Sequence, residues 1–235
     1  GKPPKLQANR FVAPTFYKTG MYLPGEETNT AYLKLFVRND WVWVKVKLRN
    51  TDVKYLQRYW SHCVPSAPTL EKRYGKYYLR FAFTESVRLN TTKPLNQRIC
   101  AVDLGINSDA VCSIMDASGT VLARKFINFS GEKDQLYHVL NRIKKFQRKN
   151  GSQNTQSFWA YAKRLNKELS KKIAAAIVEF AVLQKADCLV FEHLDFRSKK
   201  AHGSKAQKLT LWRKNGIQEY AEHKAHRCGI RVSHI

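Results

Sequence analysis

Residues 100–110 read CAVDLGINSDA, and this stretch decides how the second part of the chain folds. A short apolar run begins at Ile99, ends at Asp103, and is followed at once by Gly105 and Asn107. Such a run predicts a buried strand, and the residues after it are turn formers. Asp103 therefore either belongs to an ordinary turn or is a metal ligand held at the end of a rigid strand.

The segments after this stretch predict an α/β domain over residues 98–235. Strands are expected at residues 99–103, 110–115, 121–126, 187–193 and 229–235. Helices are expected at residues 132–148, 156–184 and 209–227, with apolar residues at steps of three and four. Three strands in a meander, then helix, strand, helix and strand, is the order of an RNase H-like fold with a mixed sheet between helices.

Residues 1–97 predict a small β-barrel domain. Runs such as WVWVKVKLR alternate apolar with polar residues, and glycines and prolines separate them. Lys45, Lys47 and Arg49 share an outward face and would meet phosphates. Trp41 and Trp43 lie on that face and could stack on bases, but aromatic strand residues are more often core, and we expect both to be buried.

The charge of the chain indicates a polyanionic partner. Lys and Arg number 42 and Asp and Glu number 18, which gives a net charge of +24. Nucleic acid is the commonest such partner, whereas an anionic membrane surface would favour an isolated basic amphipathic helix. Basic candidates for backbone binding also lie on the predicted helices 132–148 and 156–184 or directly after the first of them: Lys144, Lys145, Arg148, Lys149, Lys163 and Lys167.

Cysteine usage and hydropathy predict a cytoplasmic protein. The five cysteines are irregularly spaced, without a C-x-x-C pair, and Cys100, Cys112 and Cys188 lie in apolar runs. We expect these three in the core, a reducing compartment, and no zinc site among the cysteines. No apolar run is long enough to span a bilayer, and the opening GKPPKLQ is expected to be a linker within a protein rather than a native start.

Glu192 has the same context as Asp103, because it also follows a short apolar run. If the two strands are parallel neighbours, their carboxyl ends lie side by side, where ligands of α/β sheets bind. Two carboxylates there repel each other unless a cation neutralises them, and Mg²⁺ prefers hard oxygen ligands. Two Mg²⁺ ions about 4 Å apart can hydrolyse a phosphodiester.

Other titratable residues are weaker candidates. His193 is either a phosphate contact or a surface histidine. The remaining side chains are expected to be structural or solvent-exposed: Asp109, Asp116, Asp195, His223 and His226.

The combination of motifs resembles a known nuclease family. AVDLGINSDAV, the later LVFEHLDF and the ending HRCGIRVSHI resemble the RuvC-like nuclease domain of the transposon-encoded TnpB (OrfB) proteins and the type V CRISPR effectors. The preceding WVWVKVKL and APTLEKRYGKYYLRFAF resemble the wedge β-barrel, an OB-like nucleic-acid-binding domain, of that family.

The resemblance implies RNA-guided DNA cleavage, with guide RNA and target DNA as partners. Asp103 then matches the first RuvC carboxylate and Glu192 the second, while Trp212 and Arg213 match a place where family members contact nucleic acid. It also implies a helical recognition region and a third carboxylate after a four-cysteine zinc element. The printed sequence contains neither, so we expect further protein regions or subunits.

Two other functions are considered. The first is an RNA-guided DNA-binding protein without cleavage activity, in which the two carboxylates are relics. The second is an actin-like ATPase, because VDLGINS also resembles the first phosphate loop of that superfamily. No second glycine-rich phosphate loop follows, and a charge of +24 fits an ATPase poorly.

Overall fold

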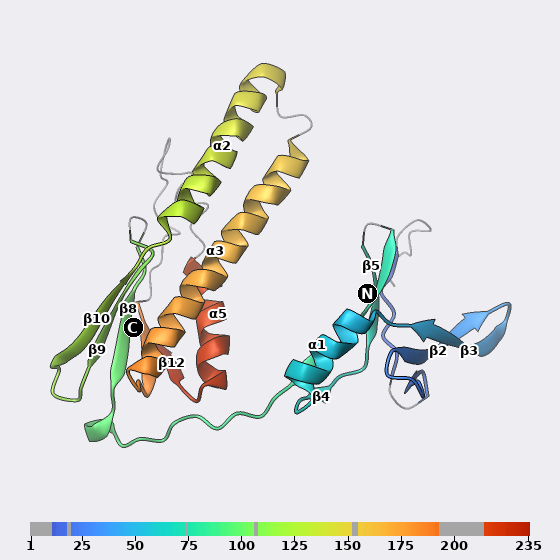
Figure 1. Cartoon of the computed structure of the whole chain (residues 1–235), viewed down its shortest axis with the longest axis horizontal. Helices are drawn as coiled ribbons and strands as arrows, with labels where there is room; N and C mark the ends of the chain where they lie inside the picture. The colour runs from blue at the N-terminus through green and yellow to red at the C-terminus, as the bar shows by residue number, and fades with distance from the viewer. Residues whose placement is uncertain (1–10, 18–19, 74, 106–107, 152–154, 193–213) are drawn as a thin grey trace, which may run out of the picture. The chain divides into compact units, whose positions relative to one another are not determined.

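The computed structural model describes residues 11–17, 20–73, 75–105, 108–151, 155–192 and 214–235 (Figure 1). It divides into two compact units, Gly1–Ser86 and Val87–Ile235. The second unit is built on a mixed sheet with helices, and the first on several small sheets. No helix within the described residues is both long and apolar enough to cross a membrane.

The sheet of the second unit has five strands in the order β10-β9-β8-β11-β12. Its strands are β8 (Ile99–Asp103), β9 (Ala110–Met115), β10 (Val121–Ile127), β11 (Cys188–Phe191) and β12 (Arg231–His234). β8, β9 and β10 pair antiparallel, whereas β11 runs parallel to both β8 and β12. The mixed sheet and the sequence order of its elements agree with the prediction.

Three helices of the second unit are described: α2 (Ser130–Asn150), α3 (Gln156–Leu183) and α5 (Lys214–Arg227). α3 and α5 lie against the sheet, while α2 and the first part of α3 form a hairpin that extends beyond it (Figure 1). This hairpin has a small core of its own, formed by Leu136, Leu140, Ile143 and Ala162. Residues 209–213 of the predicted third helix lie outside the described residues.

Side-chain alternation in the strands places one face of the sheet in the main core. Cys100, Cys112 and Leu189 are fully buried from three neighbouring strands, and Ile177 of α3 packs in the same cluster. The predicted burial of Cys100 and Cys112 is confirmed, whereas Cys188 is only half-buried. A hydrogen bond with Cys112, together with burial, raises the pKa of the Cys100 thiol, which favours the neutral thiol over the thiolate.

The structure places residues 87–97 with the second unit, whereas the sequence suggested a boundary after residue 97. The Asn90 amide donates a hydrogen bond to the Gly229 carbonyl at 2.7 Å. The Thr92 hydroxyl donates to Asp187 at 2.5 Å, and the same carboxylate accepts from the Arg98 amide at 2.9 Å. These contacts attach residues 87–97, including the 3₁₀ turn η1 (Pro94–Asn96), to the end of the sheet.

The first unit does not form the expected barrel within its described residues. Its elements are β1 (Tyr22–Pro24), β2 (Thr30–Val37), β3 (Asp40–Lys47), α1 (Asn50–Trp60), β4 (Val64–Pro65), β5 (Thr69–Arg73), β6 (Lys76–Arg80) and β7 (Phe83–Thr84). The strands make three separate sheets, β1-β2-β3, β4-β7 and β5-β6. Most pairings join strands close in sequence, and short local ribbons do not close a barrel.

Local chemistry explains two elements of the first unit. Arg38 and Asn39 have φ values of 50° and 67°, as a two-residue hairpin turn between β2 and β3 requires. The helix α1 was not predicted from the sequence, although Val53, Leu56 and Trp60 recur at helical spacing and Asp52 lies in its first turn.

Candidate functional site

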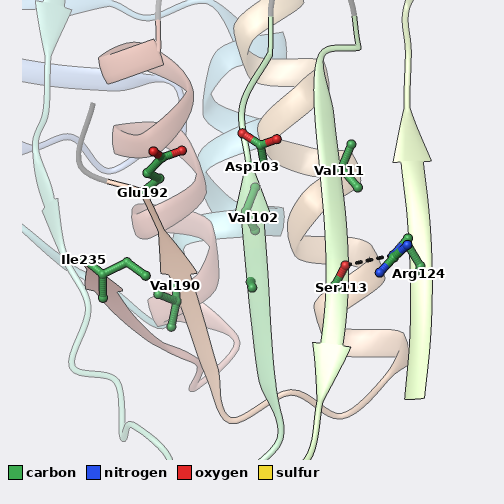
Figure 2. A pocket seen from close by; sticks show the side chains of 9 residues that line it. Val102, Asp103, Val111, Ser113, Arg124, Val190, Glu192 and Ile235 are labelled. Atoms are coloured by element: carbon green, nitrogen blue, oxygen red, sulfur yellow. Dashed lines mark hydrogen bonds between the residues drawn. The ribbon is translucent and has the colours of Figure 1, made fainter. Parts of the chain in front are cut away.

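Asp103 and Glu192 come from two adjacent parallel strands. Val102 of β8 pairs with Phe191 of β11. Asp103 directly follows Val102, and Glu192 directly follows Phe191, so the two acidic residues come at the same level of the two strands. Figure 2 shows their carboxylates at the same end of the two strands, beyond Val102 and Val190. The expected parallel pairing is therefore observed, and it brings together two side chains that are far apart in the sequence.

The two carboxylates face an open depression of about 400 Å³ on the face of the sheet opposite the main core. Val111, Ser113 and Arg124 line it from β9 and β10, and Val190 lines it from β11. Val111, Ser113 and Val190 alternate along their strands with buried residues, which explains their common direction. Asp103 and Glu192 are both exposed, so a hydrated cation can reach them.

Arg124 is a site residue that the sequence analysis did not identify. Its Nε donates a hydrogen bond to the Ser113 hydroxyl at 3.2 Å, and its side chain lines the depression (Figure 2). The neighbouring Lys125 lies instead over the ring of Phe180, 5.8 Å from its centroid. Strand alternation within the run VLARKFI separates these two basic residues, but only strand pairing shows that Arg124 shares a face with Asp103.

Asp109 has a structural role, as the sequence analysis expected. It is buried, and one carboxylate oxygen accepts a hydrogen bond from the Phe129 amide at 2.6 Å. The other oxygen lies 3.3 Å from Nζ of Lys133. These contacts join the start of β9 to the start of α2.

Asp116 also has a structural role, in the turn between β9 and β10. Its Oδ1 accepts hydrogen bonds at 2.9 Å from the amides of Ser118 and Thr120. A further hydrogen bond from the Ser118 hydroxyl is the first of the contacts that lower the pKa of Asp116 below its ordinary value. The ionised carboxylate therefore stabilises this turn.

Of the other residues that the sequence singled out, only some lie within the described part of the chain. His193, Asp195, Trp212 and Arg213 lie outside the described residues, as does the basic segment 197–208. His223 on α5 is exposed and His226 is half-buried.

A basic surface covers the helical hairpin of α2 and α3. Lys144, Lys145 and Arg148 line a depression of about 480 Å³ together with His138, Asn141 and Arg142. Lys149 lines a second depression of about 390 Å³ further along α2. Lys163 and Lys167 are exposed on α3. These predicted residues therefore lie on surfaces that a phosphate backbone can reach.

A second basic surface lies on one face of the β2–β3 hairpin. Lys45 and Lys47 of β3 are exposed there, as the strand alternation predicted, and Arg49 is exposed two residues beyond the end of β3, at the N-cap of α1. Arg49 also pairs with Asp52 at 2.7 Å, and this hydrogen bond raises the pKa of Arg49. Of these three residues, Arg49 therefore forms an ion pair, whereas the ion pairs found among the described residues include neither Lys45 nor Lys47.

The expected burial of Trp41 and Trp43 is wrong. Their exposed fractions are 51% and 41%. The register pairs Trp41 with Phe36 and Trp43 with Lys34, and the buried Leu33 lies on the opposite face. The ring of Trp41 lies 5.4 Å from that of Phe36, and Nζ of Lys34 lies 5.8 Å from the centroid of Trp43. Aromatic and basic side chains therefore alternate on one accessible surface.

Comparison with known proteins identifies a likeness in fold. No protein-family model matches the chain, and no curated protein matches it. The chain is similar to the Cas12f1 chain of a cryo-EM Cas12f1–sgRNA–target DNA complex, with a TM-score of 0.52 and 18% identity, over 78% of this chain. A cryo-EM CRISPR–Cas12f ternary complex gives a TM-score of 0.45 and 13% identity, over 99% of this chain and 55% of the other.

The chain spans 38% of the Cas12f1 chain that it matches. At 18% identity, the comparison shows only that this chain shares its fold with a part of that longer Cas12f1 chain.

Proposed function

We propose that the chain is part of an RNA-guided DNA endonuclease, with Asp103 and Glu192 as metal ligands of a RuvC-like, RNase H-like site. The observation that carries this proposal is their adjacency at the ends of the parallel strands β8 and β11. The likeness in fold to a Cas12f1 chain and the net charge of +24 support it.

The donor set suits Mg²⁺. Both side chains offer hard oxygen atoms, both are exposed, and the depression beside them leaves room for water ligands. A pair of Mg²⁺ ions supplies an activated water and stabilises the leaving oxygen of a phosphodiester. Asp103 lies on a central strand, which holds its carboxylate rigidly, and small displacements at such a site lower the rate steeply.

Arg124 would bind the substrate phosphate beside the carboxylates. A guanidinium forms directed, charge-assisted hydrogen bonds to phosphate oxygens. Its contact with Ser113 holds the side chain against the sheet, on the face that carries Asp103. This arrangement would orient a nucleic-acid strand across the open face of the sheet.

The other two surfaces would bind guide RNA and target DNA. Lys144, Lys145 and Arg148 offer cations to a phosphate backbone, which binds them without regard to sequence. Trp41 and Trp43 offer rings on which bases can stack, beside the cations of Lys45 and Lys47. Aromatic rings alternating with cations are typical of surfaces that bind single-stranded nucleic acid.

The test is cleavage by the protein assembled with guide RNA and target DNA. We expect Asp103→Ala to reduce cleavage by at least about 100-fold and to leave RNA affinity unchanged. Asp134→Ala is the matched control, because Asp134 is an exposed carboxylate on α2. Loss of RNA binding together with cleavage, or unchanged cleavage, would contradict the assignment of Asp103 as a metal ligand.

A measurement of metal binding distinguishes an endonuclease from a protein that binds target DNA without cleaving it. Mn²⁺ replaces Mg²⁺ at oxygen sites, and its electron paramagnetic resonance spectrum distinguishes free from bound ion. We expect Asp103→Asn and Glu192→Gln each to weaken Mn²⁺ binding, and Asp134→Asn to leave it unchanged. Target binding without any Mn²⁺ bound at these carboxylates would favour an RNA-guided DNA-binding protein.

A further inference from the structure

Three potential metal ligands meet in the first unit, outside the carboxylate site. His62 and Cys63 follow α1, and Glu85 follows β7. Their donor atoms (a ring nitrogen, Sγ and a carboxylate oxygen) all lie within 4.8 Å of one another. Nε2 of His62 is 3.1 Å from Oε1 of Glu85.

Strand pairing explains why these residues meet. β4 and β7 are antiparallel, and Val64 pairs with Thr84. Cys63 directly precedes this pair on one strand and Glu85 directly follows it on the other. The Cys63 amide also donates a hydrogen bond to the Trp60 carbonyl at 3.0 Å, which attaches the turn to the end of α1. The backbone therefore positions the three ligands on two segments of the chain.

We propose that His62, Cys63 and Glu85 form a Zn²⁺ site, with water as the fourth ligand. Imidazole nitrogen, thiolate sulfur and carboxylate oxygen are the donors that Zn²⁺ takes in proteins. The thiolate makes this site softer than the carboxylate pair, which selects against Mg²⁺. The sequence predicted no zinc site among the cysteines because it contains no C-x-x-C pair, and ligands that meet through strand pairing leave no such motif.

The geometry requires only small movements. Around a tetrahedral Zn²⁺ ion, N, S and O ligands lie about 3.3–3.6 Å from one another. The donor atoms lie within 4.8 Å of one another, and side-chain rotation would bring them to this spacing. Cys63 is 6% exposed, whereas the side chains of His62 and Glu85 are 54% and 25% exposed. A thiolate on the inner side and water on the outer side suit a site with one solvent ligand.

The weak core of the first unit gives such a site a physical role. α1 has no buried residue, so apolar packing contributes little to holding this helix. His62 and Glu85 are 23 residues apart in the sequence. A shared ion would cross-link the end of α1 to β7, in the way that small domains with limited cores use structural metals.

Cobalt substitution tests the proposal on the whole 235-residue chain. After removal of metal under reducing conditions, we expect one equivalent of Co²⁺ to produce the intense visible bands of tetrahedral cobalt and a thiolate charge-transfer band. Zn²⁺ should abolish both. Cys63→Ser should abolish the charge-transfer band, and Glu85→Gln should weaken the affinity for Co²⁺ at least about tenfold.

Matched controls locate the ligands. Cys228→Ser removes an exposed cysteine and His223→Asn an exposed histidine, and neither should change the spectrum. Asp103→Asn should have no effect either, so failure here is distinct from failure of the proposed nuclease site. Absence of the charge-transfer band in the wild type, or its loss in Cys228→Ser, would overturn the proposal.

A folding defect in one variant does not prevent a decision. Circular dichroism shows whether Cys63→Ser folds, and if it does not, Glu85→Gln decides the question. An unchanged affinity for Co²⁺ in Glu85→Gln would overturn the site and leave an ordinary His62–Glu85 ion pair. In the wild type, Zn²⁺ should raise the Tm of the transition that includes α1, and in Glu85→Gln it should raise it less.

Discussion

The two units of the chain differ in how much apolar surface they bury. In the second unit, β8, β9 and β11 and the helices α3 and α5 share one continuous core. In the first unit, the buried apolar side chains among the described residues are few: Phe16, Ala31, Leu33, Cys63 and Pro68. Because burial of apolar surface is the main force in folding, we expect the second unit to be the more stable of the two.

This difference matches what each unit offers to a ligand. The second unit holds Asp103 and Glu192 on adjacent strands, and a metal site of this kind needs ligands that move little. The first unit presents Trp41, Trp43 and several cations on an exposed sheet face. Such a surface gains stability when a partner covers it, since a ligand that binds the folded state stabilises that state.

Separating the units is the strongest test of this comparison. We expect a fragment of residues 87–235 to unfold cooperatively, and a metal-free fragment of residues 1–86 to show no cooperative transition. Differential scanning calorimetry measures both. A fragment of residues 98–235 is a sharper control, because it lacks the contacts of Asn90 and Thr92 and should be less stable than 87–235. Cooperative unfolding of metal-free 1–86 would contradict the comparison.

A substitution in the main core should destabilise the second unit strongly. Ile177 of α3 is fully buried, and Ile177→Ala is expected to lower the free energy of unfolding by about 2–5 kcal/mol. Leu183 lies on the same helix and is 74% exposed, so Leu183→Ala should change it by less than about 0.5 kcal/mol. Urea denaturation followed by circular dichroism gives both values. Equal effects would show that α3 is not packed as described.

The attachment of residues 87–97 should have an intermediate effect. Asp187→Ala removes the acceptor for both the Thr92 hydroxyl and the Arg98 amide. We expect a loss of about 1.5–3 kcal/mol, because hydrogen bonds to a charged group are stronger than neutral ones. Hydrogen exchange should increase at residues 87–98 and stay unchanged in α2. If exchange at residues 87–98 does not change, this segment is held by other contacts.

The turn between β9 and β10 should show a small dependence of stability on pH. The pKa of Asp116 is lowered in the folded chain, so its ionised form adds stability that is lost as the pH falls through this lowered pKa. Asn at this position keeps an acceptor without the charge. We expect wild type to have a slightly higher Tm than Asp116→Asn at neutral pH, with the difference vanishing in acid. A difference that is constant with pH would contradict this role.

Segments with a periodic apolar pattern were predicted well from the sequence, whereas features that depend on how one segment pairs with another were not. The strands around Asp103 and Glu192 and the apolar stripes of α2 and α3 follow from alternation and helical spacing. The helix α1 was missed because its signal is short and lies among strand-like runs. The described residues of the first unit do not form the expected barrel, since barrel closure depends on pairing between distant strands, which a local pattern does not encode.

The candidate site divides in the same way. Asp103 and Glu192 were found from sequence because each ends an apolar strand, a local feature. Arg124 was missed because its place beside them depends on the pairing of β10 with β9. The exposure of Trp41 and Trp43 was misjudged because a single strand shows which residues share a face, but not which face is covered.

By itself, the sequence determined the net charge of the chain, the element order of the second unit and the two carboxylates at strand ends, since these follow from residue type and spacing. Only the tertiary structure decided that Arg124 lines the same depression as Asp103 and that the aromatic face of the β2–β3 hairpin is exposed. It also decided that the donor atoms of His62, Cys63 and Glu85 lie close together. The physical reason is that these features depend on the register and packing between separate segments, which the local pattern of one segment does not encode. Register is set by packing and hydrogen bonding over the whole fold.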